Sequence, residues 1–317
     1  MRSGHMPSVA RMISLAEKGT NGTAELLADL FKAGGRCRVV GITGHAGTGK
    51  STLVAALARV LRARRSTVGI LAIDPTSPIS GGSILGDRIR MSDLTGDPGV
   101  FIRSMATRGS LGGLSRAAAD AVTALDAAGI DVVLIETVGV GQDEVDVMAA
   151  CHTTVVVCVP GLGDGVQTLK AGLLEIADVY CVNKADLPGA DGVVRDLRQL
   201  LSLEALPSQP PDEHAWKVPV VSTVALQGEG AEALAQAIDD HHAWLVASGA
   251  IHGRERAMAV ARIRNLALRL LLADLEDPSD GAGFDALVED VIHRRIDPLT
   301  AARGLVARVR GGATERS

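Results

Sequence analysis

Eight residues in the first fifth of the chain have the spacing of a phosphate-binding loop. They read G-H-A-G-T-G-K-S from Gly44 to Ser51 and match the pattern G-x-x-x-x-G-K-[ST] in full. In such a loop the glycines let backbone N–H groups surround a polyphosphate, the lysine reaches the β and γ oxygens, and the serine hydroxyl binds Mg²⁺. The motif favours a nucleotide-binding loop over an ordinary glycine-rich turn. The predicted contacts are Gly44, His45, Ala46, Gly47, Thr48, Gly49, Lys50, Ser51 and Thr52.

A second motif, Asn183-Lys184-Ala185-Asp186, predicts which base the nucleotide carries. A carboxylate at Asp186 can accept hydrogen bonds from N1–H and the 2-amino group of guanine, whereas adenine offers neither donor there. Asn183 would connect this segment to the phosphate loop, and the aliphatic stem of Lys184 would cover one face of the base. The motif therefore predicts GTP rather than ATP.

A third segment would face the guanine base from the other side. It consists of Ser222, Thr223 and Val224 and follows the apolar run 218–221. Its backbone is expected to contact the guanine O6.

An acidic residue at the end of another apolar run could complete a metal site. Glu136 follows the run 131–135 and begins E-T-V-G, a counterpart of the D-x-x-G motif of many GTPases. A carboxylate there would face Mg²⁺ or its waters, and the backbone N–H of Gly139 could contact the γ-phosphate.

Two further acids could face the same metal. Asp74 ends the run 68–73, and Asp87 lies in the glycine-rich segment 81–87. For each of the three acids, a helix cap or a solvated loop carboxylate is the alternative. The predicted metal ligands are Ser51, Asp74, Asp87 and Glu136, and the predicted catalytic residues are Lys50, Asp74, Asp87 and Glu136.

These motifs need strands whose ends lie side by side. Apolar strand-like runs alternate with helix-like segments through most of the chain, which is typical of a doubly wound, mostly parallel α/β sheet. Ligands of such sheets bind outside the carboxyl ends of the strands, where the motifs fall. The expected strands are 38–43, 68–73, 100–105, 131–135, 154–159, 179–182 and 218–221.

Helical segments are expected on both sides of this core. They cover 9–18 and 23–32 before it, and 231–246, 254–275, 284–294 and 298–309 after it. We therefore expect a helical extension over residues 1–36, a P-loop GTPase domain over 37–247 and a C-terminal helical element over 248–317.

Composition narrows the class of protein. Of the 317 residues 47% are apolar, which is enough for a sizeable core, and the net charge of -5 without a basic run argues against nucleic acid. The chain has no apolar stretch of 18 residues and no apolar leader, so we expect a cytoplasmic protein away from membranes.

The cysteines, Cys37, Cys151, Cys158 and Cys181, form no C-x-x-C pair and are expected to be reduced core residues.

Four segments together resemble the MeaB/ArgK family of P-loop GTPases. They read D-P-T-S at 74–77, G-G-S-I-L-G-D-R at 81–88, E-T-V-G-V-G-Q at 136–142 and N-K-A-D at 183–186. Members are methylmalonyl-CoA mutase-associated GTPases of the metallochaperone (SIMIBI) type, and the resemblance covers nearly the whole chain. It implies a GTP- and Mg²⁺-dependent chaperone that gates adenosylcobalamin loading into a cobalamin-dependent acyl-CoA mutase and protects that mutase. Methylmalonyl-CoA mutase or a related mutase would be the client, and an adenosyltransferase is a further candidate partner.

The resemblance also assigns roles to two other segments. It implies a homodimer with residues 254–309 in the contact, where the alternative is a helical lid on the monomer core. It likens the glycine-rich segment 160–170 to one that couples nucleotide state to the mutase, through Asp164, Gln167 and Lys170. A plain loop is the alternative for that segment.

The chain departs from the family pattern at two places. His45-Ala46 replaces a usual Pro-Pro, and Val224 replaces a usual serine. Both positions would act mainly through the backbone, so nucleotide binding should survive, while the effect on base affinity stays open. The residue after Gly139 is Val140, not the water-orienting glutamine of Ras-like enzymes, and we therefore expect slow intrinsic hydrolysis that a partner accelerates.

Two other functions stay open. A chaperone GTPase for nickel enzymes usually shows a His-rich tract or clustered cysteines, but the eight His and four Cys here are dispersed. A regulatory kinase or transport-associated ATPase is disfavoured by the N-K-A-D motif.

Overall fold

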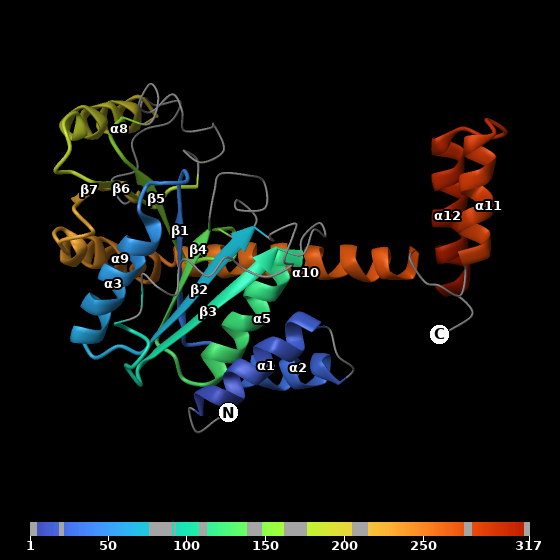
Figure 1. The fold of residues 1–317 in the computed structure, drawn as a ribbon, viewed down its shortest axis with the longest axis horizontal. Coiled ribbons are helices and arrows are strands. Elements are labelled where there is room, and N and C mark those ends of the chain that lie inside the picture. The colour runs from blue at the N-terminus through green and yellow to red at the C-terminus, as the bar shows by residue number, and fades with distance from the viewer. Residues whose placement is uncertain are drawn as a thin grey trace. The chain divides into compact units, whose positions relative to one another are not determined.

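The apolar runs of the sequence form a seven-stranded sheet in the computed structural model of the protein (Figure 1). The strands are β1 (Arg38–Thr43), β2 (Val68–Pro75), β3 (Val100–Thr107), β4 (Val132–Thr137), β5 (Thr153–Cys158), β6 (Val179–Asn183) and β7 (Val220–Thr223). Their order is β3-β2-β4-β1-β5-β6-β7, and each neighbouring pair is parallel. The expected doubly wound α/β fold is confirmed. The chain leaves β1 toward β2 on one side and later crosses to β5 on the other, so the loop after β1 lies at the point where the winding reverses.

The structure describes residues 5–18, 22–75, 91, 93–107, 113–137, 148–161, 176–204, 215–275 and 281–313. The chain divides into two compact units, residues 1–262 and residues 263–317. The functional division expected from the sequence, with boundaries after residues 36 and 247, stays a prediction.

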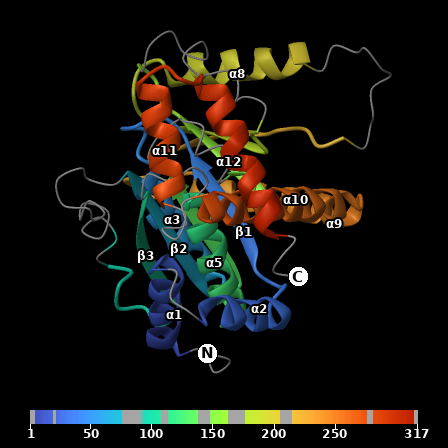
Figure 2. The same cartoon turned by 90° about the vertical axis from the view of Figure 1, so that its right-hand side faces the viewer.

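Helices cover both faces of the sheet (Figures 1 and 2). On one face α3 (Lys50–Ala63) and α9 (Ala231–Ala247) bury side chains such as Leu53 and Leu234 against Val40 of β1. On the other face α1 (Met6–Lys18) and α5 (Gly113–Ala127) pack against Val39 of β1, and α2 (Thr23–Ala33) lies beside them. On that same face, α8 (Ala190–Glu204) covers β5 and β6. The side chains of successive residues in one strand therefore pack against the helices on opposite faces of the sheet, as strand geometry requires.

Among the described residues, three helices follow α9. α10 (Ala250–Leu275) runs from the first compact unit into the second, which also contains α11 (Gly281–Ile292) and α12 (Pro298–Ala313). Asp297 caps α12, because its carboxylate accepts hydrogen bonds from the backbone N–H groups of Leu299 (2.9 Å) and Thr300 (3.1 Å). α11 and α12 pack as a hairpin (Figure 2).

The four cysteines are all free and buried, as expected. Burial raises the pKa of each thiol to about 12, so the thiolate form is suppressed. Among the described residues, no helix combines the length and the apolar composition that crossing a membrane requires.

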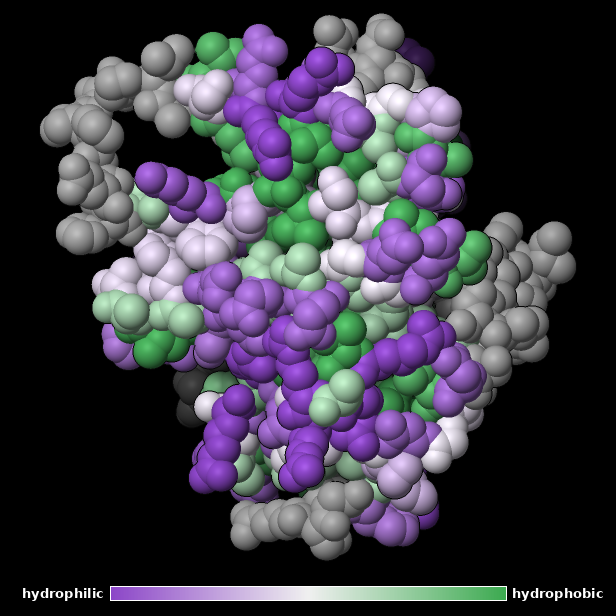
Figure 3. Space-filling model, turned by 90° about the vertical axis from the view of Figure 1, so that its left-hand side faces the viewer, coloured by the Kyte–Doolittle hydropathy of each residue, from purple (hydrophilic) through white to green (hydrophobic). Residues whose placement is uncertain are grey.

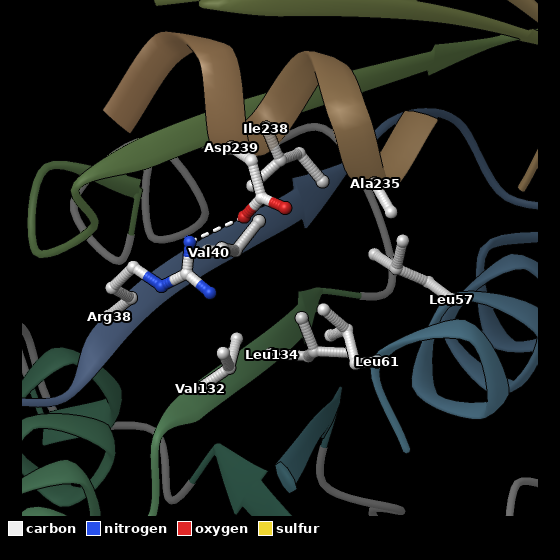
Figure 4. A pocket seen from close by; sticks show the side chains of 9 residues that line it. All are labelled: Arg38, Val40, Leu57, Leu61, Val132, Leu134, Ala235, Ile238 and Asp239. Atoms are coloured by element: carbon white, nitrogen blue, oxygen red, sulfur yellow. Dashed lines mark hydrogen bonds and ion pairs between the residues drawn. The ribbon is translucent and has the colours of Figure 1, made fainter. Parts of the chain in front are cut away.

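A small apolar pocket lies at the amino ends of β1 and β4, on the side of α3 and α9 (Figure 4). Asp239 of α9 closes one side of it through ion pairs with Arg38 and Arg64. The pocket lies at the opposite end of the strands from the phosphate-loop motif, which places it outside the candidate site.

Seen from the side of α3 and α9, hydrophilic residues dominate the middle of the surface (Figure 3).

Polar and aromatic side chains, two of them buried and four half-buried, form a cluster at the amino ends of β5 and β6. His241 of α9 is 1% exposed, and its Nδ1 lies 2.9 Å from the Thr153 hydroxyl. Its Nε2 lies 3.4 Å from the Asp178 carboxylate, which forms an ion pair with Arg254 of α10. The rings of Trp216 and Trp244 pack on His241, with centroids 4.9 and 5.9 Å away. We call these six residues, Thr153, Asp178, Trp216, His241, Trp244 and Arg254, the basal cluster.

The buried histidine predicts acid sensitivity of the fold. Burial, and then the nearby Arg254, lower the pKa of His241 to about 4. An unfolded chain takes up this proton near pH 6.5, so the free energy of unfolding should be constant above that pH and fall as the pH drops from 6.5 toward 4. We expect a loss of about 2 kcal/mol from this group between pH 7 and pH 4.5, measured by urea denaturation.

Two features make that measurement specific. Burial raises the pKa of Asp178, and protonation of that carboxylate in the folded state has an effect of opposite sign, so the slopes of the protein and its variants should be compared over one pH range, 6.5 to 5. His241→Gln should reduce the slope but leave the share of His152, whose pKa burial also lowers to about 4, and His252→Gln, at a side chain 86% exposed, should not change it. An equal slope in the protein and in His241→Gln would contradict the prediction.

Candidate nucleotide-binding site

The phosphate-loop motif connects the end of β1 to the start of α3. Gly44 follows β1 with φ of 143°, and a Cβ at this position would lie 2.3 Å from the carbonyl oxygen of Val157 in β5. Only glycine can pass so close to the neighbouring backbone. The next turns bring the backbone N–H groups of the loop to the N-terminus of α3, an end of a helix that attracts anions.

Lys50, the first residue of α3, is folded back over this loop. Its side chain is buried, and Nζ donates hydrogen bonds to the carbonyl oxygens of Gly44 (2.7 Å) and His45 (2.9 Å). The Thr48 hydroxyl also donates to His45 O (2.9 Å). The ammonium group is therefore held at the mouth of the loop, within reach of a phosphate that lies in it.

Two of the four predicted metal ligands are in contact. The Ser51 hydroxyl donates to Oε1 of Glu136 at 2.7 Å, and both side chains are buried. They meet because β4 lies next to β1, with Glu136 opposite Ile42. A hydroxyl and a carboxylate are hard oxygen donors of the kind that Mg²⁺ prefers, so the pair fits that ion.

The other predicted acids are placed less fully. Asp74 is the seventh residue of β2, whose Ala72 pairs with Glu136, so its backbone lies at the same edge of the sheet. Its side chain, like Asp87 and Gly139, lies outside what the structure describes. Within the described residues, no group of three His, Cys, Asp or Glu side chains is arranged to hold a metal. A metal at Ser51 and Glu136 would therefore depend on further oxygen ligands, such as those of phosphates.

Asn183, the last residue of β6, joins three segments of the site. Its Nδ2 donates to the carbonyl oxygen of Thr48 in the phosphate loop (2.8 Å). Its Oδ1 accepts hydrogen bonds from the Thr223 hydroxyl (3.1 Å) and from the backbone N–H of Ala225 (3.0 Å). The amide orientation is thus fixed by donors on one side and an acceptor on the other.

The residues after Asn183 turn over the phosphate loop. Lys184 adopts φ of 56°, and its Nζ donates to the carbonyl oxygen of Gly47 at 2.9 Å. The N–H of Ala185 donates to Thr223 O (3.0 Å), which places Asp186 in the exposed turn that follows. The Asp186 side chain is exposed, so a nucleotide base could approach its carboxylate from solvent.

The segment from Ser222 corrects one expectation. Ser222 and Thr223 are the last residues of β7, not a loop after a strand at 218–221. The pairing of Tyr180 with Val220 fixes this register, and Pro219 contributes only its carbonyl oxygen, to Tyr180 N (2.9 Å). The turn begins at Val224, half-buried, which bridges to Glu229.

Sequence reasoning missed two hydroxyl contacts. Thr137 donates to Thr43 at 3.1 Å, joining the ends of β4 and β1 beneath the phosphate loop. The thiol of Cys181 lies 3.2 Å from the hydroxyl of Thr223. The only available signal was polar residues in otherwise apolar strands. The predicted coupling residues, Asp164, Gln167 and Lys170, lie outside the described residues.

The contact between the loop and Asn183 predicts the effect of one substitution. Gly49 has φ of 85°, and a Cβ there would lie 2.6 Å from Asn183 Nδ2. Gly49→Ala should weaken GDP binding by at least about tenfold, since it strains the backbone and displaces this amide. Titration calorimetry measures the change. In an Asn183→Ala background the same substitution should cost less, and equal costs in both backgrounds would assign the effect to the backbone alone.

Known proteins resemble this chain over most of its length. A family model described as methylmalonyl Co-A mutase-associated GTPase MeaB matches residues 9–279. A protein of Pyrococcus abyssi that carries a GTPase name is 44% identical over 98% of this chain and 95% of its own length. The GTPase ArgK of Escherichia coli is 34% identical over 83% of this chain and 80% of its own length.

Two further likenesses concern a eukaryotic relative and a solved structure. The mitochondrial methylmalonic aciduria type A homolog of Caenorhabditis briggsae is 36% identical over 68% of this chain and 52% of its own length. The crystal structure of a LAO/AO transport system kinase aligns with a TM-score of 0.68 at 23% identity, covering 98% of this chain and 95% of that one. This last likeness concerns the fold.

Proposed function

This chain belongs to the MeaB family of methylmalonyl-CoA mutase-associated GTPases and is a GTPase, and we infer its cellular role from that membership. We propose that it is a metallochaperone whose GTP hydrolysis gates adenosylcobalamin loading into a cobalamin-dependent acyl-CoA mutase and protects that mutase. Methylmalonyl-CoA mutase is the first candidate client. The family description and the name of the Caenorhabditis relative support this choice.

One observation carries the guanine-nucleotide part of the proposal. Asn183 holds the N-K-A-D turn, the end of β7 and the phosphate loop together through hydrogen bonds of 2.8 to 3.1 Å. A nucleotide with its phosphates in the loop would then place its base beside Asp186. The carboxylate would accept from guanine N1–H and its 2-amino group.

The hydrolytic part rests on Lys50, Ser51 and Glu136. Lys50 would exchange its two carbonyl partners for the β and γ oxygens, stabilising the charge that develops on them. Ser51 and Glu136 would hold Mg²⁺, which supplies further charge stabilisation when bound. We propose Asp74 and Asp87 as additional groups near that metal, and Gly139 as a backbone donor to the γ-phosphate.

We further propose a homodimer built on residues 254–309. α10 carries exposed leucines at 268, 270, 271 and 272 together with exposed Ile263, and these positions lie on more than one side of the helix. α11 exposes Phe284, Val288 and Ile292 at a spacing of four residues, which places them on one stripe. Helices that are apolar over so much of their surface are normally covered. Sedimentation velocity would distinguish a dimer from a monomer with a helical lid.

The coupling to the client is proposed for the segment after β5. Asp164, Gln167 and Lys170 would transmit the nucleotide state, as the family resemblance implies. Cys158 ends β5 next to the phosphate-loop strand β1, so a change at the phosphates has a short route to that segment.

The deciding experiment compares GTP hydrolysis with and without a cobalamin-dependent acyl-CoA mutase from the same source. We expect slow hydrolysis alone and at least several-fold stimulation by the mutase. Lys50→Ala, assayed in parallel, subtracts any contaminating activity. No stimulation, with GTP still bound tightly, would leave a GTPase whose client is another protein.

A further inference from the structure

Asp178 immediately precedes β6, the strand that ends in the N-K-A-D motif. Its backbone N–H donates to Thr154 O (2.9 Å), and its Oδ2 accepts from the N–H of Thr154 (2.8 Å). Its carbonyl oxygen accepts from the indole N–H of Trp216 (2.8 Å), in the segment that leads to β7. Its Oδ1 pairs with Arg254 of α10 and lies 3.4 Å from His241 of α9. One residue thus ties the start of β6 to four neighbouring segments.

This carboxylate is largely shielded from solvent, and its partner Arg254 is half-buried, with a side chain that is 29% exposed. The Asp178 side chain is 13% exposed, and His241 beside it is 1% exposed. The rings of Trp216 and Trp244 lie 5.8 Å apart and close the space above His241. Charges in such surroundings interact more strongly than on a surface, and removing one partner leaves the other costly to bury.

β6 connects the basal cluster rigidly to the nucleotide motifs. Its five residues are all buried, and it is paired with β5 on one side and β7 on the other. A strand of fixed rise in a close-packed layer shifts as a unit. A displacement at Asp178 would therefore reach Asn183, whose contact with Thr48 depends on the height of the strand end.

We propose that Asp178 and Arg254 are positioning residues for guanine recognition: their ion pair holds β6 at the height at which Asn183 reaches the phosphate loop. The inference rests on the guanine site proposed above. It makes α10 part of the nucleotide site's support, although α10 contacts the sheet at the opposite end of the strands. Because linkage is reciprocal, bound nucleotide would also strengthen the attachment of α10.

His241 provides a signature that a purely structural contact would lack. The groups that face it are Asp178, Arg254 and the neighbouring His242, together with the Thr153 hydroxyl and the two indole rings. Arg254 helps to lower the pKa of His241, so removal of the guanidinium raises that pKa. The imidazole could then take up a proton and replace the lost positive charge beside Asp178.

The test compares GDP affinity of full-length variants by titration calorimetry. Arg254→Met should weaken GDP binding by about tenfold at pH 8 and recover part of that loss at pH 6, because burial still lowers the pKa of His241 when the guanidinium is gone. The double variant Arg254→Met/His241→Gln should stay weak at both pH values. Arg254→Lys, which keeps the charge, should lose less and show little pH dependence. Arg256→Met, at an exposed arginine of the same helix, is the control and should match the unaltered protein.

The outcomes separate this inference from the proposed function. If the unaltered protein binds no GDP, the guanine site itself is wrong. If it binds GDP and Arg254→Met binds equally well at pH 8, the positioning role is overturned while the guanine site stands. Equal weakness of Arg254→Met at pH 8 and pH 6 would overturn the role of the charge. If Arg254→Met does not fold, as seen in its far-ultraviolet circular dichroism, the comparison of Arg254→Lys with Arg256→Met decides.

Discussion

Lys50→Ala should reduce GTP hydrolysis by at least about a hundredfold, because the buried Lys50 Nζ lies on the carbonyl oxygens of Gly44 and His45, where the phosphates would bind. Lys184 also contacts the loop, at Gly47 O, but it does so from the exposed N-K-A-D turn and is expected to lie along the base. The buried Lys50 amine donates to two loop carbonyl oxygens, and a bound phosphate would take their place as its acceptors. The positive charge therefore stabilises the loop when the site is empty and the phosphates when nucleotide is bound. Alanine also leaves the carbonyl oxygens of Gly44 and His45 without these hydrogen bonds. GTP affinity should therefore fall as well.

Single-turnover hydrolysis at saturating GTP separates the two effects. Lys217→Ala, at an exposed lysine before β7, is the matched control and should hydrolyse GTP at the normal rate. Unchanged thermal unfolding of Lys50→Ala without nucleotide would exclude general loss of structure. A Lys50→Ala rate within a few-fold of normal would show that the phosphates bind elsewhere.

Asp186→Asn should exchange the base preference of the site. The carboxylate of Asp186 is an acceptor only and suits the two donors of guanine, whereas an amide offers one acceptor and one donor. Xanthine presents N1–H beside a 2-oxo group, which matches that amide. We expect GDP affinity to fall by about three orders of magnitude and XDP affinity to rise, since sites built on polar pairing discriminate strongly.

Competition against a fluorescent nucleotide measures both affinities, with ADP as the third ligand. Asp191→Asn, an exposed acid in the first turn of α8, controls for the loss of one negative charge near this edge. Unaltered GDP affinity in Asp186→Asn would remove Asp186 from the base site. A gain for ADP in place of XDP would show that the new amide donates to adenine N1 and does not pair with a 2-oxo group.

The sheet and its motifs could be predicted because their signals are local. The apolar composition of runs such as 38–43 and 131–135 predicts strands. The motifs G-H-A-G-T-G-K-S and N-K-A-D are each contiguous in sequence, so they can be recognised without the fold. Parallel strands that carry such motifs bring them to one edge, whatever the rest of the chain does. The placement of Ser51 beside Glu136, 85 residues later, follows from β1 and β4 being neighbours.

Other features could not be predicted because they depend on pairing between distant residues. The end of β7 is set by its register against β6, which the apolar run at 218–221 does not encode. The ion pair of Arg254 with Asp178 spans 76 residues, and the Thr137 hydroxyl reaches Thr43 across 94. An arginine in a helix and an aspartate before a strand are ordinary residues until the fold brings them together. Charge and hydroxyl patterns carry no such information along the chain.

The state of the four cysteines has a practical consequence. Each thiol is buried and its pKa is raised to about 12, so alkylating dyes that attack exposed thiolates should leave the folded protein unlabelled. A single cysteine introduced on the surface would then be the only position that reacts. Pairs of dyes on α8 and α11, for example, would report changes in distance upon nucleotide or mutase binding in the otherwise natural chain.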